Sequence, residues 1–376
     1  MSLLAGLMSG TSLDGVDGVL AEFDDLTLRP VGVLAHAHRG FAPDQAAELL
    51  ALNTSGNDEL HRAALAANRL MQTYADVVTQ LLALADCRPD AVAAIGAHGQ
   101  TVRHRPQAFS GPGYTVQLVN GALLAELTGI STVCDFRSAD LAAGGQGAPL
   151  VPAFHAACLG NAGQDAAVLN VGGIANLTLL PALGPVGGFD TGPGNLLMDL
   201  WCRRTQGQPY DASGAIAASG QVDSELLQRM MAEPFFAAAP PKSTGRDQFH
   251  AAWLDHHLAT LSTLSHGPAD VMATLAELTA RTTADALQRH LPSVRRLLVC
   301  GGGAFNDHLM RRWGALLPTI DVDTTQTIGI PADQVEALAF AWLAACRLQG
   351  RPASLPGVTG ARAARVLGAV YAAPPP

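Results

Sequence analysis

The segment MSGTSLDGVD, near the start of the chain, carries more polar groups than a turn requires. It follows an apolar run with strand character and offers the hydroxyls of Ser9, Thr11 and Ser12 and the carboxylates of Asp14 and Asp17. Hydroxyls and glycine amides bind phosphate oxygens, and carboxylates beside a phosphate hold Mg²⁺ or orient an attacking hydroxyl. The segment is therefore either an elaborate turn or part of an active site.

Glycine clusters follow predicted strands or open predicted helices at four places. They are Gly144, Gly145 and Gly147; Gly172 and Gly173; Gly192 and Gly194; and Gly301, Gly302 and Gly303. Glycine lets backbone N–H groups approach a ligand closely, and a helix N-terminus favours a phosphate. A tight turn without a ligand explains any one cluster. Four clusters, each with an Asn or Gln nearby, favour a nucleotide site.

The nucleotide chemistry does not use a Walker A loop, because that loop needs a lysine directly after its last glycine. The chain has one lysine, Lys242, and it lies in the segment PKSTGR. The segment GGGAFN lacks the third glycine of the dinucleotide fingerprint, which disfavours a Rossmann oxidoreductase. Another phosphate-binding architecture is expected.

Two further acids are candidates for catalysis. Asp190, in GFDTGPGN, follows a predicted strand, where an Asp is either a general base or a turn cap. Glu336, in PADQVEALAF, is the third residue after Asp333, so the pair predicts a helix capping box. An acid in the first helical turn also remains available to a ligand.

His98 and Gln100, in IGAHGQT, follow a strand-like run, as residues at the ligand-binding end of an α/β sheet do. A single histidine is more often structural. The histidines lack the HExxH spacing of a zinc site, and no GxSxG elbow of an α/β-hydrolase is present.

Strand-like apolar runs alternate with helical stretches along the chain, which predicts an α/β fold. Residues 58–84 and 269–290 have helical periodicity and length. The segments LAGLMSGTSLDGVDGVLAE and AAVLNVGGIANLTLL both have the order strand, polar turn, strand, about half a chain apart. This internal similarity predicts a duplicated fold in which each half contributes one glycine-bearing turn.

Composition limits the possible partners. The chain has 376 residues, 48% of them hydrophobic and 15% charged, which predicts a folded protein of two domains. The net charge of -9, without a basic cluster, disfavours nucleic-acid binding. Six scattered cysteines without CxxC spacing suit reduced thiols, and no apolar run approaches the roughly 20 residues that span a bilayer. We therefore expect a cytoplasmic protein that binds small molecules and no membrane.

Taken together, the motifs resemble those of the anhydro-N-acetylmuramic acid kinase family, over nearly the whole chain. They are LMSGTSLDGVD (7–17), IGAHGQT (95–101), DFRSADLAAGGQGAPLVP (135–152), LNVGGIANLT (169–178), GFDTGPGN (188–195), PKSTGR (241–246) and VCGGGAFN (299–306). The resemblance implies two duplicated actin-like ATPase domains of ribonuclease H-like α/β fold around a deep interdomain cleft. We expect the first domain at residues 1–140 plus about 355–376 and the second at 141–354.

The family's reaction adds water across the 1,6-anhydro bond of 1,6-anhydro-N-acetylmuramic acid and phosphorylates O6 with ATP and Mg²⁺. It gives N-acetylmuramic acid 6-phosphate in peptidoglycan recycling. The resemblance implies a phosphotransferase with an alcohol acceptor, expected as a homodimer, in which Asp190 is the general base and Glu336 a second catalytic candidate.

The remaining implied roles are as follows. The β- and γ-phosphates would be held by Gly10, Thr11, Ser12, Leu13, Asp14, Gly15, Val16 and Asp17 and by a second turn with Gly172, Gly173 and Asn176, with Asp14 or Asp17 near Mg²⁺. Adenosine would lie by Gly301, Gly302, Gly303 and Asn306. The sugar would meet His98, Gln100, Arg137 and Gln146, with Arg137 gripping the lactyl carboxylate.

Two rival functions remain at this point. One is a sugar kinase of the same superfamily that phosphorylates a free hydroxyl, in which Asp190 would deprotonate the sugar instead of water. The other is a chaperone-like or filament-forming ATPase, although no remaining segment is large enough for a peptide-binding domain. The sequence leaves the role of PKSTGR open.

Overall fold

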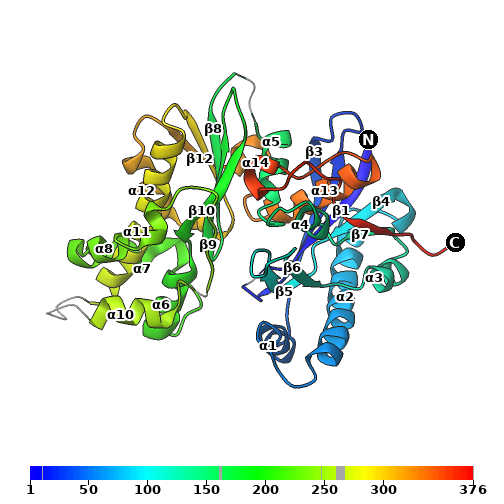
Figure 1. Cartoon of the computed structure of the whole chain (residues 1–376), viewed down its shortest axis with the longest axis horizontal. Coiled ribbons are helices and arrows are strands. Elements are labelled where there is room, and N and C mark those ends of the chain that lie inside the picture. Colours follow the sequence, from blue (N-terminus) through cyan, green and yellow to red (C-terminus); the bar gives the residue numbers. More distant parts are fainter. Residues whose placement is uncertain (11, 161–162, 247, 260–266, 376) are drawn as a thin grey trace. The chain divides into compact units, whose positions relative to one another are not determined.

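The computed structural model describes residues 1–10, 12–160, 163–246, 248–259 and 267–375. They form two compact units, and Figure 1 colours both along the sequence from blue at the N-terminus to red at the C-terminus. The first unit is Met1–Leu159 with Gln334–Pro376, and the second is Gly160–Asp333. In the described part of the chain, no helix combines the length and apolar character that crossing a membrane requires.

The first unit is built on a mixed sheet of six strands in the order β13-β7-β4-β1-β2-β3. The strands are β1 (Ser2–Met8), β2 (Gly15–Phe23), β3 (Pro30–Gly40), β4 (Val92–Ala97), β7 (Thr132–Cys134) and β13 (Ala369–Tyr371). Strands β1, β2 and β3 form an antiparallel meander, whereas β4 is parallel to β1 and β7 is parallel to β4. Because β1 and β4 are parallel, MSGTS and AHGQ follow them at the same edge.

Helices and one separate hairpin complete the first unit. The hairpin is β5 (Gln100–Arg105) with β6 (Tyr114–Leu118). The helices are α1 (Pro43–Ala51), α2 (Glu59–Leu84), α3 (Gly121–Thr128), α4 (Ser138–Ala142), α5 (Val151–Cys158), α13 (Val335–Leu348) and α14 (Pro356–Thr359), with a 3-10 turn, η1 (Pro89–Ala91).

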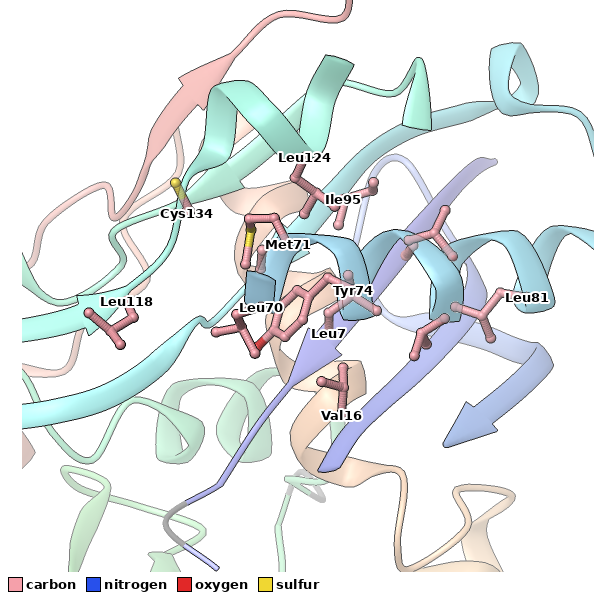
Figure 2. Packing of buried hydrophobic residues seen from close by; sticks show 14 of the residues in the cluster. Leu7, Val16, Leu70, Met71, Tyr74, Leu81, Ile95, Leu118, Leu124 and Cys134 are labelled. Atoms are coloured by element: carbon pink, nitrogen blue, oxygen red, sulfur yellow. The ribbon is translucent and has the colours of Figure 1, made fainter. Parts of the chain in front are cut away.

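Helix α2 covers one face of the first sheet and confirms the helix predicted at residues 58–84. Its buried residues Leu70, Tyr74 and Leu81 are spaced so that they share one side of the helix. They pack with Leu7 of β1 and Val16 of β2 in one apolar cluster (Figure 2). Burial of this cluster fixes the two strands that flank the MSGTSLD turn.

Helix α13 packs on β1, β2 and β4, and two glycines allow its close approach. Gly6 of β1 and Gly96 of β4 are partners in the parallel ladder. A Cβ on Gly6 would overlap the carbonyl oxygen of Ala337, and a Cβ on Gly96 would overlap that of Phe340. The backbone of α13 therefore rests directly on the sheet, at a position that only glycine permits.

The unit boundaries differ from the domain boundaries expected from the sequence, which were 1–140 with about 355–376 and 141–354. The structure groups α5 and α13 with the first unit. Helix α13 contacts β1, β2 and β4, and α5 contacts α13. These are contacts between distant parts of the chain, which composition and periodicity do not reveal.

The second unit has a sheet of five strands in the order β10-β9-β8-β11-β12. They are β8 (Ala166–Val171), β9 (Ile174–Leu180), β10 (Gly187–Pro193), β11 (Arg296–Cys300) and β12 (Asp321–Thr324). Strands β8, β9 and β10 are antiparallel, whereas β11 is parallel to β8 and β12 is parallel to β11. Strands β8 and β11 therefore end at the same edge.

The helices of the second unit include α11, which confirms the helix predicted at residues 269–290 and contacts β9 and β10. The helices are α6 (Leu196–Gln206), α7 (Ala215–Ser219), α8 (Ser224–Met231), α9 (Pro234–Ala237), α10 (Ala251–Ala259), α11 (Pro268–His290) and α12 (Asp307–Leu316). Three 3-10 turns are η2 (Ala212–Gly214), η3 (Gly302–Phe305) and η4 (Thr325–Ile328).

The two sheets share one topology. In each, three antiparallel strands are followed by two parallel strands, and the fourth strand pairs with the first: β1, β2, β3, β4 and β7 match β8, β9, β10, β11 and β12. The predicted duplication of an α/β fold is therefore confirmed, and the two similar hairpins are β1–β2 and β8–β9.

Because α13 packs so closely on β1, we expect Gly6→Ala to destabilise the protein by about 1–3 kcal/mol, since a methyl group has no space against the helix backbone. The urea midpoint of unfolding measures this effect. Gly32→Ala is the matched control, since Gly32 also lies in a strand of the first sheet but a Cβ there meets no atom within 4 Å. Equal midpoints for the two variants would contradict the close approach of α13.

Candidate active site

The β1–β2 turn of the first unit, residues 9–14, is held by backbone and amide contacts. The carbonyl oxygen of Gly10 accepts hydrogen bonds from the amide of Leu13, at 3.3 Å, and from Nε2 of Gln100, at 3.1 Å. Ser12 Oγ donates to Asp14 Oδ1 at 2.8 Å. Thr11, a predicted phosphate contact, lies outside the described residues. We call this segment the first turn.

Asp17 is engaged within the protein. Its Oδ1 lies 2.9 Å from Nδ1 of His38 and 3.7 Å from Nε2 of His36. Burial acts to raise the pKa of Asp17, but the hydrogen bonds from the two histidines outweigh it and hold the pKa below its usual value. Asp14, by contrast, is exposed. The two acids of the motif therefore have different environments, which the sequence did not distinguish.

The other predicted phosphate contacts of this segment belong to the strand or the core. Val16 is fully buried in the cluster with α2, and Leu13 packs against that cluster. Gly15 begins β2, and a Cβ there would overlap the carbonyl oxygen of Arg39. The side chains of Leu13 and Val16 therefore anchor the turn to the hydrophobic core.

His98, Arg137 and Glu336 lie together in the first unit. Nη2 of Arg137 is 2.9 Å from Nε2 of His98, and its Nη1 donates to the carbonyl oxygen of Gly147 at 2.8 Å. Burial lowers the pKa of Arg137 to about 10, and the charge of Glu336 opposes that shift. The arginine remains charged at neutral pH, held on two sides by the protein.

Gln100 and Gln146 have different placements. Gln100 is 1% exposed, so its amide serves to fix Gly10. The backbone amide of Gln146 donates to the carbonyl oxygen of Thr359 at 2.8 Å. This contact ties the glycine-rich loop at residues 143–147 to the C-terminal part of the first unit.

Asp140, which sequence reasoning missed, organises that loop. It is fully buried, and its Oδ2 accepts the amide of Gly147 at 2.8 Å while Oδ1 accepts Thr359 Oγ1 at 2.8 Å. The only sequence feature that could have pointed to Asp140 is its position shortly before the glycines in DLAAGGQG. That position does not reveal that the acid is buried. Asp140 therefore holds Gly147, the residue whose carbonyl oxygen Arg137 contacts.

Glu336 lies in the first turn of α13, but the predicted capping box is wrong. The N-cap residue is Gln334, without a side-chain cap hydrogen bond, so Glu336 is the second helical residue. Residues 332–334 form a turn in which the carbonyl oxygen of Ala332 accepts the amide of Gly301 at 2.8 Å. This turn delays the start of the helix past Asp333.

In the second unit, the turn of Gly172 and Gly173 is bonded to the segment that follows β10. The amides of Gly194 and Leu196 donate to the carbonyl oxygen of Gly173, and the amide of Asn195 donates to that of Gly172. These bonds bring two of the predicted glycine clusters together. We call residues 172–173 the second turn.

Three polar residues lie in register across neighbouring strands of the second sheet. Asn176 of β9 pairs with Asn170 of β8 on one side and with Asp190 of β10 on the other. Directly opposed residues of antiparallel strands place their side chains on the same face. The predicted base therefore shares a face with the predicted phosphate residue Asn176, and Asn170 is an addition that the sequence reasoning missed.

Asp190 is bound by the segment PKSTGR. Its Oδ2 accepts the backbone amide of Thr244 at 2.9 Å, and its own amide donates to the carbonyl oxygen of Lys242 at 3.2 Å. Burial raises the pKa of Asp190 to about 6, against the opposing effects of the Thr244 amide and the Lys242 charge. A carboxylate with such a pKa can accept a proton near neutral pH.

Lys242 is held beside Asp190. Its Nζ donates to the carbonyl oxygens of Phe235 at 3.0 Å and Phe236 at 3.2 Å, and it lies 4.6 Å from the ring centroid of Phe235. The only lysine of the chain thus anchors the segment that bonds the carboxylate. This contact gives PKSTGR a structural role that its sequence left open.

The Gly301–Gly303 loop follows β11 beside the second turn. A Cβ on Gly301 would lie 2.5 Å from Asn170 Oδ1, so the loop passes close to the row of polar residues. Asn306 caps α12 by accepting the amide of Leu309 at 3.0 Å. The side chain of Asn306 therefore holds the helix that follows the loop.

A cavity of about 650 Å³ lies in the second unit among α7, α8, α11 and α12. Its lining includes His308 and Arg312 of α12, which follow Asn306 closely in the chain, and Glu277 of α11. Glu277 is buried and accepts two hydrogen bonds from Arg312, at 2.7 and 3.0 Å. No predicted site residue lines this cavity.

A family model and curated relatives match nearly the whole chain and carry the same family description. A family model described as anhydro-N-acetylmuramic acid kinase matches residues 2–373. Curated relatives of that name from Albidiferax ferrireducens and Variovorax paradoxus are 56% and 57% identical over 391 and 376 aligned positions, each covering 99% of both chains. A solved structure, the activator of the 2-hydroxyisocaproyl-CoA dehydratase from Clostridium difficile, aligns with 92% of this chain and 96% of its own at 10% identity, with a TM-score of 0.48. The chain belongs to the anhydro-N-acetylmuramic acid kinase family.

Proposed function

We propose that this kinase opens the 1,6-anhydro ring of 1,6-anhydro-N-acetylmuramic acid with water and phosphorylates O6 with ATP, and that Asp190 is the general base. The environment of Asp190 carries the proposal. It is a half-buried carboxylate with one oxygen bonded to the Thr244 amide and a pKa of about 6. It is therefore ionised at neutral pH and still basic enough to take a proton from water.

The proposed reaction balances as one hydrolytic and one phosphoryl-transfer event. Asp190 takes a proton from a water molecule whose oxygen bonds to C1 of the sugar. The C1–O6 bond breaks, and its electron pair moves to O6, which bonds to the γ-phosphorus of ATP as ADP leaves. Because O6 gains negative charge as it meets the phosphorus, no separate base is needed for the acceptor oxygen. Glu336 is the second acid proposed to assist, on the sugar side.

The phosphates are proposed to meet the first and second turns. Gly10, Ser12 and the glycines at 172–173 offer backbone and hydroxyl donors, and Asn176 lies in register with Asp190. Phosphoryl transfer depends mainly on positioning and electrostatic stabilisation, which backbone donors supply. Thr11 is also proposed to contact the phosphates, as expected from the sequence.

Adenosine is proposed to lie by Gly301–Gly303 and Asn306. The loop follows β11 at the edge where β8 also ends, and the start of α12 leads to the cavity that His308 lines. The cavity is large enough for a nucleoside, which supports this placement.

A Mg²⁺ ion is proposed to bind at Asp14 of the first turn. No group of three His, Cys, Asp or Glu side chains in the described residues forms a metal cage, and Mg²⁺ usually takes one or two carboxylates with phosphate and water. Asp14 is exposed, whereas Asp17 is bonded to His38, so we propose Asp14 as the ligand. When bound, the ion neutralises charge on the transferred phosphoryl group.

On the sugar side, Arg137 is proposed to bind the lactyl carboxylate. Gln146, which precedes Gly147 in the glycine-rich loop, is proposed as a further sugar contact. A guanidinium suits a carboxylate because it presents paired donors in one plane. Arg137 already holds a fixed orientation through its contact with Gly147. Gln100 is proposed to act through Gly10, which its side chain contacts.

We also propose that the enzyme works in the cytoplasm as a homodimer. The six cysteines are all free thiols, which supports a reducing compartment. The dimer rests on the family resemblance alone. Sedimentation velocity measures whether two chains pair.

Asp190→Asn is expected to lower kcat by about 10²–10⁴-fold, because the amide cannot accept the proton of the attacking water. Binding of ATP should change little. The assay is mass spectrometry of the sugar product formed from ATP, Mg²⁺ and 1,6-anhydro-N-acetylmuramic acid in ¹⁸O-labelled water. Label at C1 distinguishes ring opening from phosphorylation of a free hydroxyl.

The matched control is Asp199→Asn. Asp199 also has a pKa raised to about 6 by burial, but it belongs to α6 and is not part of the proposed machinery. Near-normal turnover by Asp190→Asn, or an equal loss in Asp199→Asn, would reject Asp190 as the base.

The pH profile provides a second test of Asp190. A base acts when deprotonated, so kcat/KM should fall as the pH drops below about 6, the pKa of Asp190. Lys242→Met removes a charge that lowers this pKa, so the acidic limb should move to higher pH. Lys242→Arg keeps the charge and should leave the limb in place. A limb that stays fixed in Lys242→Met would contradict the pairing of these groups.

Arg137→Gln tests the contact with the lactyl group. Hydrogen bonds to charged groups contribute about 1.5–3 kcal/mol, so KM for the lactyl-bearing sugar should rise about 10-fold to 100-fold. For 1,6-anhydro-N-acetylglucosamine, which lacks the carboxylate, KM should differ little between Arg137→Gln and the unmodified enzyme. An equal rise for both sugars would argue against carboxylate recognition by Arg137.

A further inference from the structure

His98 occupies a buried position between the first turn and Arg137. It follows β4, is 5% exposed, and lies 4.7 Å from the ring centroid of Phe340 on α13. Its Nδ1 is 3.3 Å from the carbonyl oxygen of Ser9, and its Nε2 is 2.9 Å from Nη2 of Arg137. Both ring nitrogens therefore have partners within the protein.

The chemistry of these partners fixes the form of the imidazole. An arginine side chain only donates hydrogen bonds, so Nε2 of His98 must accept. The ring is then neutral with its proton on Nδ1, which donates to the carbonyl oxygen of Ser9. Burial, together with the charge of Arg137, lowers the pKa of His98 to about 3, which agrees with a neutral ring.

Arg137 is held from the opposite direction as well. Its Nη1 donates to the carbonyl oxygen of Gly147, and the amide of Gly147 is fixed by the buried carboxylate of Asp140. The guanidinium thus has one acceptor at each Nη atom, and these set its plane. Removal of the His98 acceptor would leave one of the two supports.

The Ser9 side of the contact is equally well fixed. Ser9 Oγ lies 3.1 Å from the carbonyl oxygen of Gly99 and 3.0 Å from Tyr74 OH, so the serine donates to Gly99 and the tyrosine donates to the serine. Tyr74 is part of the α2 cluster in Figure 2. The backbone that enters the first turn is therefore anchored at Ser9, where His98 also binds.

We propose that His98 is a positioning residue and not a sugar ligand: through Nε2 it orients Arg137, and through Nδ1 it fixes the backbone that leads into the first turn. The inference rests on the proposed function, because Arg137 is taken as the sugar contact and the first turn as a phosphate contact. It changes the role expected for His98 from the sequence. One neutral ring links the two substrate subsites of the first unit.

Two substitutions separate the two contacts. Asparagine places its amide where Nδ1 lies, so His98→Asn keeps a donor for Ser9 and loses the acceptor for Arg137. Glutamine places its amide where Nε2 lies, so His98→Gln keeps an acceptor for Arg137 and loses the donor for Ser9. Steady-state KM values for the anhydro sugar and for ATP, with Tm as a measure of folding, test both.

For His98→Asn we expect KM of the sugar to rise about 10-fold to 100-fold while KM of ATP changes less than about twofold. For His98→Gln we expect the reverse pattern, with KM of ATP raised several-fold and KM of the sugar near that of the unmodified enzyme. His155→Gln, at another fully buried histidine of the first unit, should lower Tm without changing either KM.

The proposal is overturned if both His98 variants raise the two KM values equally, or if both lower Tm and leave the KM values unchanged. The first result would show that the two contacts do not act separately on the two substrates, and the second would assign His98 to packing alone. Failure of the proposed function is a separate outcome, because the unmodified enzyme would then give no sugar phosphate from the anhydro sugar.

Discussion

The first unit depends on the close packing of α13 against two paired glycines of the sheet. Gly6 and Gly96 are neighbours in the ladder of β1 and β4, and neither position has space for a Cβ beneath the helix backbone. The same helix carries Glu336 in its first turn, whose charge acts on Arg137, and Phe340, which packs against the ring of His98. The two glycines thus set the distance between the helix and the strands. This distance in turn places Glu336 near Arg137 and Phe340 against His98.

Duplication explains where the polar residues of each unit gather, and divergence explains what they do. In both sheets the first and fourth strands are parallel and end at one edge, so a hairpin turn and a second loop meet there. In the first unit this edge holds hydroxyls, a neutral histidine and an arginine. In the second unit it holds glycine loops, and Asp190 lies in register with Asn176 nearby. One topology thus supplies a frame for two different sets of donors.

The sequence predicted features that depend on local pattern and missed features that depend on distant contacts. The helices at α2 and α11 and the duplicated fold follow from periodicity and from the repeated hairpin, and the structure confirms them. The capping box at Asp333 failed because a turn bonded to Gly301 delays the helix. The bond from Thr244 to Asp190 joins residues far apart in the chain, so no spacing rule reveals it. The environments of Asp14 and Asp17 also differ through distant contacts, because Asp17 is bonded to His38 on β3 whereas Asp14 is exposed.

The placement of the single lysine determines how the proposed site handles charge. Two carbonyl oxygens hold the Lys242 ammonium near Asp190, where its charge lowers the pKa of that proposed base. Arg137 is fixed in the first unit by His98 and Gly147, where a sugar carboxylate is proposed to bind. With these cations engaged, the negative charge of the triphosphate is proposed to be balanced by backbone amides, hydroxyls and a metal ion. Such donors are fixed by the turns themselves, and this explains why the proposed phosphate contacts are glycines held by backbone hydrogen bonds.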